Sequence, residues 1–320
     1  VTDSNDYRRY PDSNLSSSVH NPGQSWNALT VGAFTSKIQI QDTMLQNYRP
    51  VADKGELSPF STTSLLWPKR KWPLKPEVVF EGGNVAIGPN DSVVNAEDLQ
   101  LISTYHDPQI TQFAPFDQTS AAAAQAAWMA AQIQASYPDA WPETVRALIV
   151  HTAEWTDAMK RQFLPESAGK EAYERFLRIC GYGVPNLERA LHCAANSLTL
   201  ICQNELQPYS VRDGRAVTND LHFYQLPWPT DVLRDMGETN VTMRVTLSYF
   251  IEPGPGEVGW QDRYRYPSHA LRFAINGPGE SEQEFLARIN LQAREEEGHP
   301  GTEGPQDHWL IGNARNVGSI

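Results

Sequence analysis

Residues 116–131, FDQTSAAAAQAAWMAA, predict the helix around which the chain is organised. Alanine has the highest helix propensity and a very small side chain, so this run predicts a slim helix that packs closely in a crowded interior. An irregular segment ends with Asp117, Gln118 and Thr119. The Ser120 hydroxyl therefore lies at the start of the helix. Such a serine is either a nucleophile or an ordinary helix N-cap.

The composition narrows the class of protein. The 320 residues are enough for two domains, and a hydrophobic share of 40% with 23 prolines and 21 glycines is typical of a loop-rich globular chain. The formal net charge of −12 argues against a nucleic-acid or anionic-membrane partner, because phosphate binding needs a basic surface. No apolar run approaches the roughly 18 residues of a membrane span. Three cysteines without metal-ligand spacing predict free, buried thiols at Cys180, Cys193 and Cys202.

Short strands are predicted upstream of the alanine helix. Residues 26–35 and the buried run 78–80 have strand patterns, and residues 99–105 form a third candidate. Gly82 and Gly83 end the second strand and allow another backbone to pass close to it. Residues 1–23 are polar and turn-rich, which predicts a surface loop. The Asp/Asn cluster at residues 3–6 could ligate a structural calcium ion, although it lacks calcium-loop spacing and a solvated turn is the alternative.

The pattern changes downstream of the alanine helix. A second helix begins at Pro142 and places Val145, Leu148, Ile149 and Thr152 on one face, and a third short helix covers residues 187–195. Residues 243–250 and 271–276 alternate with a period of two, which predicts antiparallel strands, and residues 280–297 predict an acidic helix. We therefore expect an α/β domain over residues 1–197 and a β-rich, sandwich-like accessory domain, truncated at its end, over residues 198–320.

Seven segments carry a family resemblance when they are taken in order. They are TVGA (30–33), FSTTS (60–64), KPEVV with its glycine pair (75–83), IST (102–104), TS with its alanines (119–124), VRAL (145–148) and GYG (181–183). Together they resemble the C-terminal half of the catalytic domain of a subtilase, a subtilisin-like serine protease. The fold class implied is an incomplete subtilisin-like parallel-sheet domain, followed here by antiparallel structure.

The resemblance implies a role for Ser120 as the nucleophile that forms an acyl-enzyme with a polypeptide substrate. The substrate-binding or oxyanion neighbourhood would then comprise Phe116, Asp117, Gln118, Thr119, Gly82 and Gly83. Two positions depart from the family pattern, because Gln118 stands where glycine is usual and Ala124 where proline is usual. Gln118 would narrow the leaving-group side of the cleft.

The upstream parts of the family's active site are not found before Ser120. The resemblance identifies no counterpart there of the family's aspartate, of its His-Gly-Thr segment or of its oxyanion asparagine, so it implies a fragment that is inactive alone. His20 and His106 lack the Gly-Thr context and His151 lies in the second helix, so we interpret all three as structural or surface residues. The other five histidines lie downstream: His192, His222, His269, His299 and His308.

Two alternatives to a protease stay open at this point. One is a catalytically silent subtilase relative that binds peptides or proteins. The other is a different α/β enzyme, against which the sequence has no Gly-x-Ser-x-Gly elbow, no glycine-rich phosphate loop and no metal-ligand cluster. Cleavage specificity, oligomeric state and a secreted or cytoplasmic location are not indicated by the residues.

Overall fold

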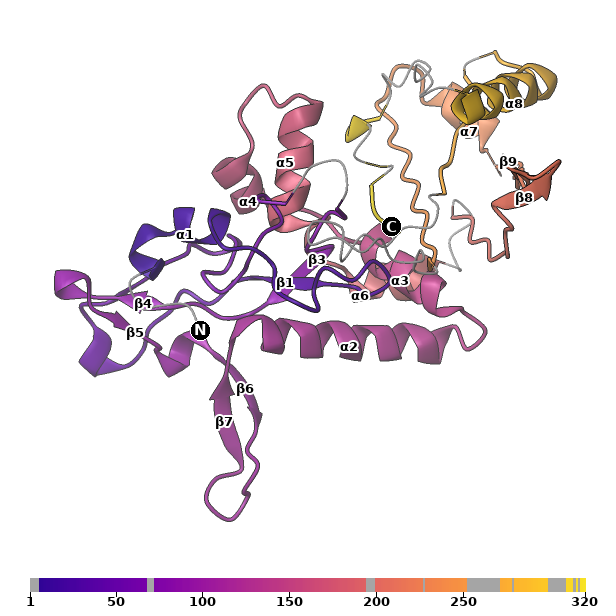
Figure 1. Cartoon of the computed structure of the whole chain (residues 1–320). Helices are drawn as coiled ribbons and strands as arrows, with labels where there is room; N and C mark the ends of the chain where they lie inside the picture. Colours follow the sequence, from indigo (N-terminus) through magenta and orange to yellow (C-terminus); the bar gives the residue numbers. More distant parts are fainter. Residues whose placement is uncertain are drawn as a thin grey trace.

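A small parallel sheet forms the centre of the computed structural model, which describes residues 6–67, 72–193, 199–226, 228–251, 271–277, 279–298, 309–312, 315 and 317–320. Strands β1 (Val31–Phe34) and β3 (Val78–Glu81) pair in parallel, with Val31 opposite Val78 and Phe34 opposite Glu81. Helix α2 (Gln118–Ser136) lies beneath this sheet in Figure 1, and α4 (Asp157–Phe163) and α5 (Lys170–Cys180) lie above it. The predicted α/β class with a parallel sheet is confirmed.

Strand β3 is buried on both faces, as expected for a parallel strand. Val78 and Phe80 pack on the α2 side, in a core that includes Met129. Val79 points to the other face and packs against Phe176 and other residues of α4 and α5. The continuous apolar run that predicted a buried strand is therefore explained by helices on both sides of the sheet.

The predicted alanine helix is confirmed as α2. Its buried positions follow helical spacing toward the sheet and toward α3 (Pro142–His151) and α6 (Leu187–His192), and they are Ala121, Ala122, Ala126, Met129 and Ile133. Pro142 is the first residue of α3, and the predicted apolar face of that helix is buried. The segment GYG (181–183) runs beside β3, where the Tyr182 N–H donates to Glu77 O at 2.7 Å. A Cβ at Gly181 would lie 2.3 Å from the same oxygen, so glycine is required there.

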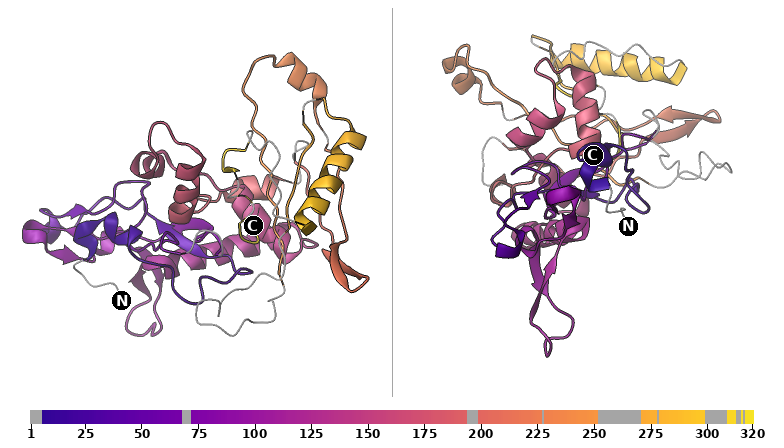
Figure 2. Two further views of the ribbon diagram at one scale, coloured as in Figure 1. Left: turned by 45° about the horizontal axis from the view of Figure 1, so that its top comes forward. Right: turned by 90° about the vertical axis from the view of Figure 1, so that its left-hand side faces the viewer.

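Antiparallel pieces surround this centre. Strands β2 (Arg49–Pro50), β4 (Ala86–Ile87) and β5 (Val93–Val94) form a three-stranded sheet. Strands β6 (Leu101–Thr104) and β7 (Phe113–Phe116) form a hairpin directly before α2. This hairpin projects away from the remaining chain in Figure 1 and in the right-hand view of Figure 2. Three single-turn 3-10 helices lie in the connecting segments: η2 (Thr43–Leu45), η3 (Pro89–Asp91) and η4 (Glu97–Leu99).

The surface loop predicted for residues 1–23 is wrong for part of that stretch. Residues 1–5, and with them most of the candidate calcium cluster, lie outside the described residues. The following residues form η1 (Asp6–Arg9) and α1 (Asp12–Leu15), and the Asn14 side chain is only 1% exposed. Its Nδ2 donates to Ser58 O at 2.9 Å and to Ser61 O at 2.8 Å. A polar stretch is buried here because its amide satisfies buried carbonyl oxygens.

The C-terminal third contains fewer strands than its alternation predicts. Its described elements are β8 (Tyr209–Arg212) paired antiparallel with β9 (Arg215–Thr218), helix α7 (Thr230–Asp235) and helix α8 (Glu282–Gly298). Helix α8 confirms the predicted acidic helix. Residues 243–250 and 271–276 carry no assigned strand, so the two strands predicted there are not formed. The Tyr249 N–H instead donates to Ser319 O at 3.1 Å.

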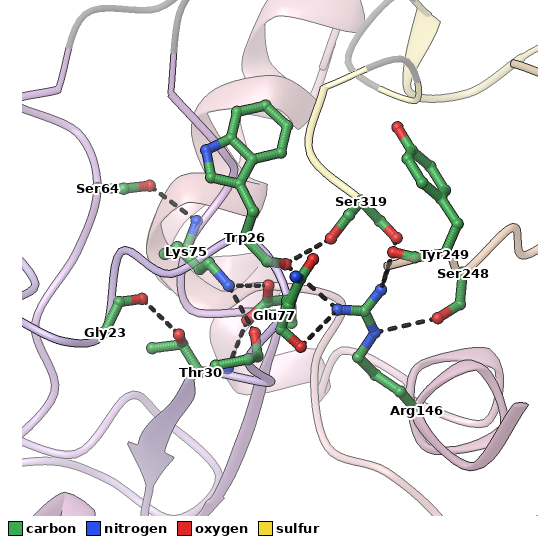
Figure 3. A network of polar contacts seen from close by, with 12 residues as sticks. Gly23, Trp26, Thr30, Ser64, Lys75, Glu77, Arg146, Ser248, Tyr249 and Ser319 are labelled. Carbon is green, nitrogen blue, oxygen red and sulfur yellow. Dashed lines mark hydrogen bonds and ion pairs between the residues drawn. The ribbon is translucent and has the colours of Figure 1, made fainter. Parts of the chain in front are cut away.

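A buried arginine binds this C-terminal chain to the α/β centre (Figure 3). Arg146 of α3 is 5% exposed, and its guanidinium donates to four carbonyl oxygens and to the Ser248 hydroxyl. The carbonyls belong to Trp26 (3.2 Å), Asn27 (2.9 Å), Tyr249 (2.8 Å) and Ser319 (2.8 Å). All five acceptors are neutral. The contacts join three segments that are far apart in the sequence.

A carboxylate near Arg146 offsets the cost of burying its charge. Burial lowers the pKa of Arg146, and the Glu77 carboxylate opposes that shift. Glu77 is itself buried and forms an ion pair with buried Lys75, whose Nζ also donates to Ala28 O at 2.8 Å. The Thr30 N–H donates to Glu77 Oε2 at 2.7 Å. Figure 3 shows Lys75, Glu77 and Arg146 next to one another in this polar network.

The three cysteines match the predicted free, buried thiols only in part. Cys180, Cys193 and Cys202 are free thiols, although Cys202 is exposed rather than buried. No described helix has both the length and the apolar character needed to cross a membrane. Within the described ranges, no three His, Cys, Asp or Glu side chains gather as a metal site would require.

Candidate active site

Ser120 lies exposed in the first turn of α2, at the carboxyl end of β3. The Gln118 N–H donates to Gly82 O at 2.8 Å, which joins the residue two positions before the serine to the residue that follows β3. Ligands of open α/β folds bind at the carboxyl ends of parallel strands. The fold therefore brings the predicted Ser120, Gln118, Gly82 and Gly83 to one place, although they come from two separate stretches of sequence.

The glycine pair permits this close approach. A Cβ on Gly82 would lie 2.4 Å from the Ala33 Cβ and 3.2 Å from Gln118 O. Gly83 has a φ of +83°, and a Cβ there would lie 2.9 Å from Leu99 O. No other residue type fits at Gly82 without moving the start of α2 or strand β1.

Gln118 has a φ of +67°, in the left-handed region that favours glycine. The subtilase resemblance implies glycine at this position, and glycine adopts such a conformation without steric cost. The Gln118 side chain is exposed and forms no hydrogen bond within the described residues. It stands two residues before Ser120 and adds no hydrogen bond to the described fold.

The N-cap residue of α2 is Asp117. Ser120 therefore does not have the N-cap role that was the alternative to a nucleophile. The Asp117 side chain does not cap the helix, because its Oδ2 accepts a hydrogen bond from Gln100 Nε2 at 2.6 Å. The first-turn N–H groups of α2 are therefore left without a side-chain cap, as an anion-binding helix start requires. Thr119 is half-buried, and Phe116, the last residue of β7, is 37% exposed.

A groove of about 250 Å³ runs along α2 from the residue after Ser120. Its lining carries no charged side chain and consists of Leu101, Ile102, Ser103, Phe116, Ala121, Ala124, Gln125 and Trp128. Ile102 is 79% exposed and Trp128 57% exposed, so apolar surface is open to solvent beside the serine. Gln125 and Trp128 were not predicted as site residues, although positions one, four, five and eight after Ser120 share a helix face.

The histidines upstream and in α3 do not serve Ser120 in this arrangement. His20 and His106 are exposed, and the His106 ring packs at a tilt of 55° against the Tyr105 ring, with centroids 4.2 Å apart. His151 Nδ1 lies 3.0 Å from Thr246 Oγ1, and burial, followed by the charges of Arg244 and Arg189, lowers its pKa. Among the described residues, none of the histidines hydrogen-bonds Ser120. Within the described residues, the Ser120 hydroxyl thus lies at the start of α2, beside helix-end N–H groups, and no histidine is hydrogen-bonded to it.

The sequence profile of the subtilase family matches residues 3–183, or 181 of the 320 residues, and the chain belongs to this family of serine peptidases. An "Uncharacterized protein y4bN" of Sinorhizobium fredii (strain NBRC 101917 / NGR234) is 29% identical over 248 residues. That match covers 75% of this chain and 53% of the relative, so the chain spans about half the length of the relative. No solved structure matches the chain significantly.

Proposed function

We propose that the protein containing this chain is a serine endopeptidase in which Ser120 forms an acyl-enzyme with a polypeptide substrate. One observation carries the proposal: an exposed serine stands in the first turn of α2, and the Gln118 N–H to Gly82 O bond fixes that turn at the carboxyl end of β3. Membership of the subtilase family supports the reaction class.

The chemistry follows from this placement. Ser120 Oγ attacks the carbonyl carbon of the scissile peptide and gives its proton to a histidine base, which passes it to the leaving amine. Uncapped N–H groups at the start of α2 stabilise the negative oxygen of the tetrahedral intermediate. Water then hydrolyses the acyl-enzyme. The substrate-binding or oxyanion neighbourhood consists of Phe116, Asp117, Gln118, Thr119, Gly82 and Gly83.

The base, its aspartate and the oxyanion asparagine are supplied by polypeptide outside these 320 residues. Loss of a triad residue lowers the rate by roughly 10⁴ to 10⁶, a magnitude measured on subtilisin, which is itself a member of this family. The 320 residues alone are therefore expected to be inactive.

The test uses the full-length protein and Ser120→Ala. We expect the variant to lose at least about 10³-fold of the hydrolysis of a denatured protein substrate, because the nucleophile is gone. Ser136→Ala, at the other end of the same helix, should keep the wild-type rate. Unchanged hydrolysis in Ser120→Ala would overturn the assignment.

A second candidate is a catalytically silent subtilase relative that binds peptides or proteins. It is favoured by Gln118 at a position suited to glycine and by a serine without a histidine partner among the described residues. A fluorophosphonate probe separates the two candidates, because it reacts only with an activated serine. Labelling of full-length protein at Ser120, lost in Ser120→Ala, would exclude the silent relative.

A further inference from the structure

A side-chain amide ties the start of α2 to the end of β3, in addition to the bond between backbone groups. Gln125 Nε2 donates to Glu81 O at 2.7 Å and to Ala121 O at 3.0 Å. Glu81 is the last residue of β3, and Ala121 directly follows Ser120. One amide group therefore bridges the strand end and the helical turn that carries the serine.

The strand end that receives this bond is itself held firmly. Glu81 Oε2 accepts hydrogen bonds from the Ser36 N–H and hydroxyl, both at 2.6 Å, and Oε1 accepts from the Gly83 N–H at 2.9 Å. The Gly82 N–H donates to Phe34 O at 2.9 Å, and the Ser58 hydroxyl donates to Gly83 O at 2.7 Å. Hydrogen bonds with Phe34, Ser36 and Ser58 thus hold residues 81–83 in place, so the bond from Gln125 has a rigid partner.

The helix needs such a tie because its packing surface is smooth. Near its start α2 presents Ala121, Ala122 and Ala126 to the interior. Contacts between methyl groups are non-directional and resist sliding or rotation of the helix weakly, whereas a hydrogen bond fixes distance and direction. Gln118, two residues before the serine, adds a left-handed backbone conformation, which persists only where its surroundings enforce it.

We propose that Gln125 is a positioning residue, which holds the first turn of α2 and therefore Ser120 in place against the Gly82 and Gly83 backbone. Gln125 does not touch the reacting atoms and acts through the helix. The positional part of this inference stands without the proposed function, and only its effect on rate rests on that function.

The positional part is tested by amide hydrogen exchange on the 320-residue chain. Gln125→Met keeps the side-chain length and removes the donor, so we expect the Gln118 amide, bonded to Gly82 O, to exchange at least about tenfold faster. Gln132→Met is the matched control, because Gln132 is exposed on the same helix and forms no hydrogen bond within the described residues. Equal Gln118 exchange in wild type and Gln125→Met, or equal acceleration in both variants, would overturn the proposal.

The catalytic part is tested on the full-length protein. A displacement of the nucleophile by about 1 Å costs on the order of 100-fold in rate, so Gln125→Met should lower kcat and the rate of fluorophosphonate labelling roughly 10- to 100-fold while KM stays constant. If that variant does not fold, Gln125→Asn, whose amide is one methylene too short to reach Glu81 O, should give the same loss. A wild type that is not labelled contradicts the proposed function, whereas equal labelling of wild type and variant contradicts the positioning role.

Discussion

At the scale of single residues, Gln118 combines a left-handed backbone with a side chain that the fold does not use. Non-glycine residues in this region store about 1–3 kcal/mol of strain, and such strain gathers at functional sites. Here the Gln118 N–H is bound to Gly82 O, and Gly82 has no room for a side chain. The conformation is therefore imposed by contact between two backbones, not by the preference of glutamine.

Substitution of Gln118 tests this account of the strain. Gln118→Gly should raise the free energy of unfolding by up to about 1 kcal/mol, because glycine adopts positive φ without steric cost. Gln118→Val should lower it by about 1 kcal/mol or more, since a β-branched residue tolerates that region least. Denaturant titration of the purified chain gives both values. If the valine variant were more stable than the glycine variant, the backbone of Gln118 would not be strained.

At the scale of elements, the end of α3 joins the α/β centre to the C-terminal chain through a histidine as well as an arginine. His151 is the last residue of α3, and its Nδ1 contacts Thr246 Oγ1. Arg244 Nη1 donates to Ala153 O at 2.9 Å, just beyond the helix. Burial, followed by the charges of Arg244 and Arg189, lowers the pKa of His151. The last residue of α3 therefore resists protonation.

The lowered pKa of His151 predicts an acid-sensitive fold. Above the ordinary value of 6.5 the imidazole is neutral in both states, and its contribution to stability is fully present. Below 6.5 the unfolded chain binds the proton first, so stability falls until the pH passes the folded-state pKa. Urea titrations on either side of this window, at about pH 7.5 and about pH 5.5, should show a smaller loss on acidification in His151→Gln than in wild type. An identical loss in both proteins would exclude His151 as a cause.

At the scale of the whole molecule, Arg146 makes the C-terminal chain part of the folded centre. Its guanidinium holds Ser248, Tyr249 and Ser319 against Trp26 and Asn27, and it also lies over the Phe250 ring at 4.9 Å from the centroid. The domain boundary near residue 197 stays a prediction, yet these contacts show that the segments on its two sides share a buried cation.

Removal of that cation should cost much more than removal of a surface arginine. Arg146→Met leaves four carbonyl oxygens without their donor and the Lys75 and Glu77 pair without its neighbouring charge, so we expect a loss of at least about 3 kcal/mol. Arg234→Met in α7 removes an exposed i,i+3 pair with Asp231 and should cost under about 1 kcal/mol. Denaturant titration measures both losses. Comparable losses would show that the buried network contributes little.

The sequence by itself determined the elements whose signal is local. The alanine run predicted α2, the apolar triplet of residues 78–80 predicted β3, and the spacing of Val145, Leu148 and Ile149 predicted the buried face of α3. The order of seven short segments also predicted the family. These predictions succeed because propensity and periodicity act between residues that are neighbours in the chain.

Only the tertiary structure decided how those elements are joined. The bonds of Asn14 with Ser58, Gln125 with Glu81 and Arg146 with Ser319 span 44, 44 and 173 positions, and no local pattern encodes such partners. The alternation of residues 243–250 predicted a strand, but Tyr249 bonds Ser319 and Arg146 instead. The site follows the same rule: the sequence supplied Ser120 and two glycines, and the folded chain supplied the left-handed Gln118, the uncapped helix start and the tie from Gln125, because each depends on one backbone meeting another.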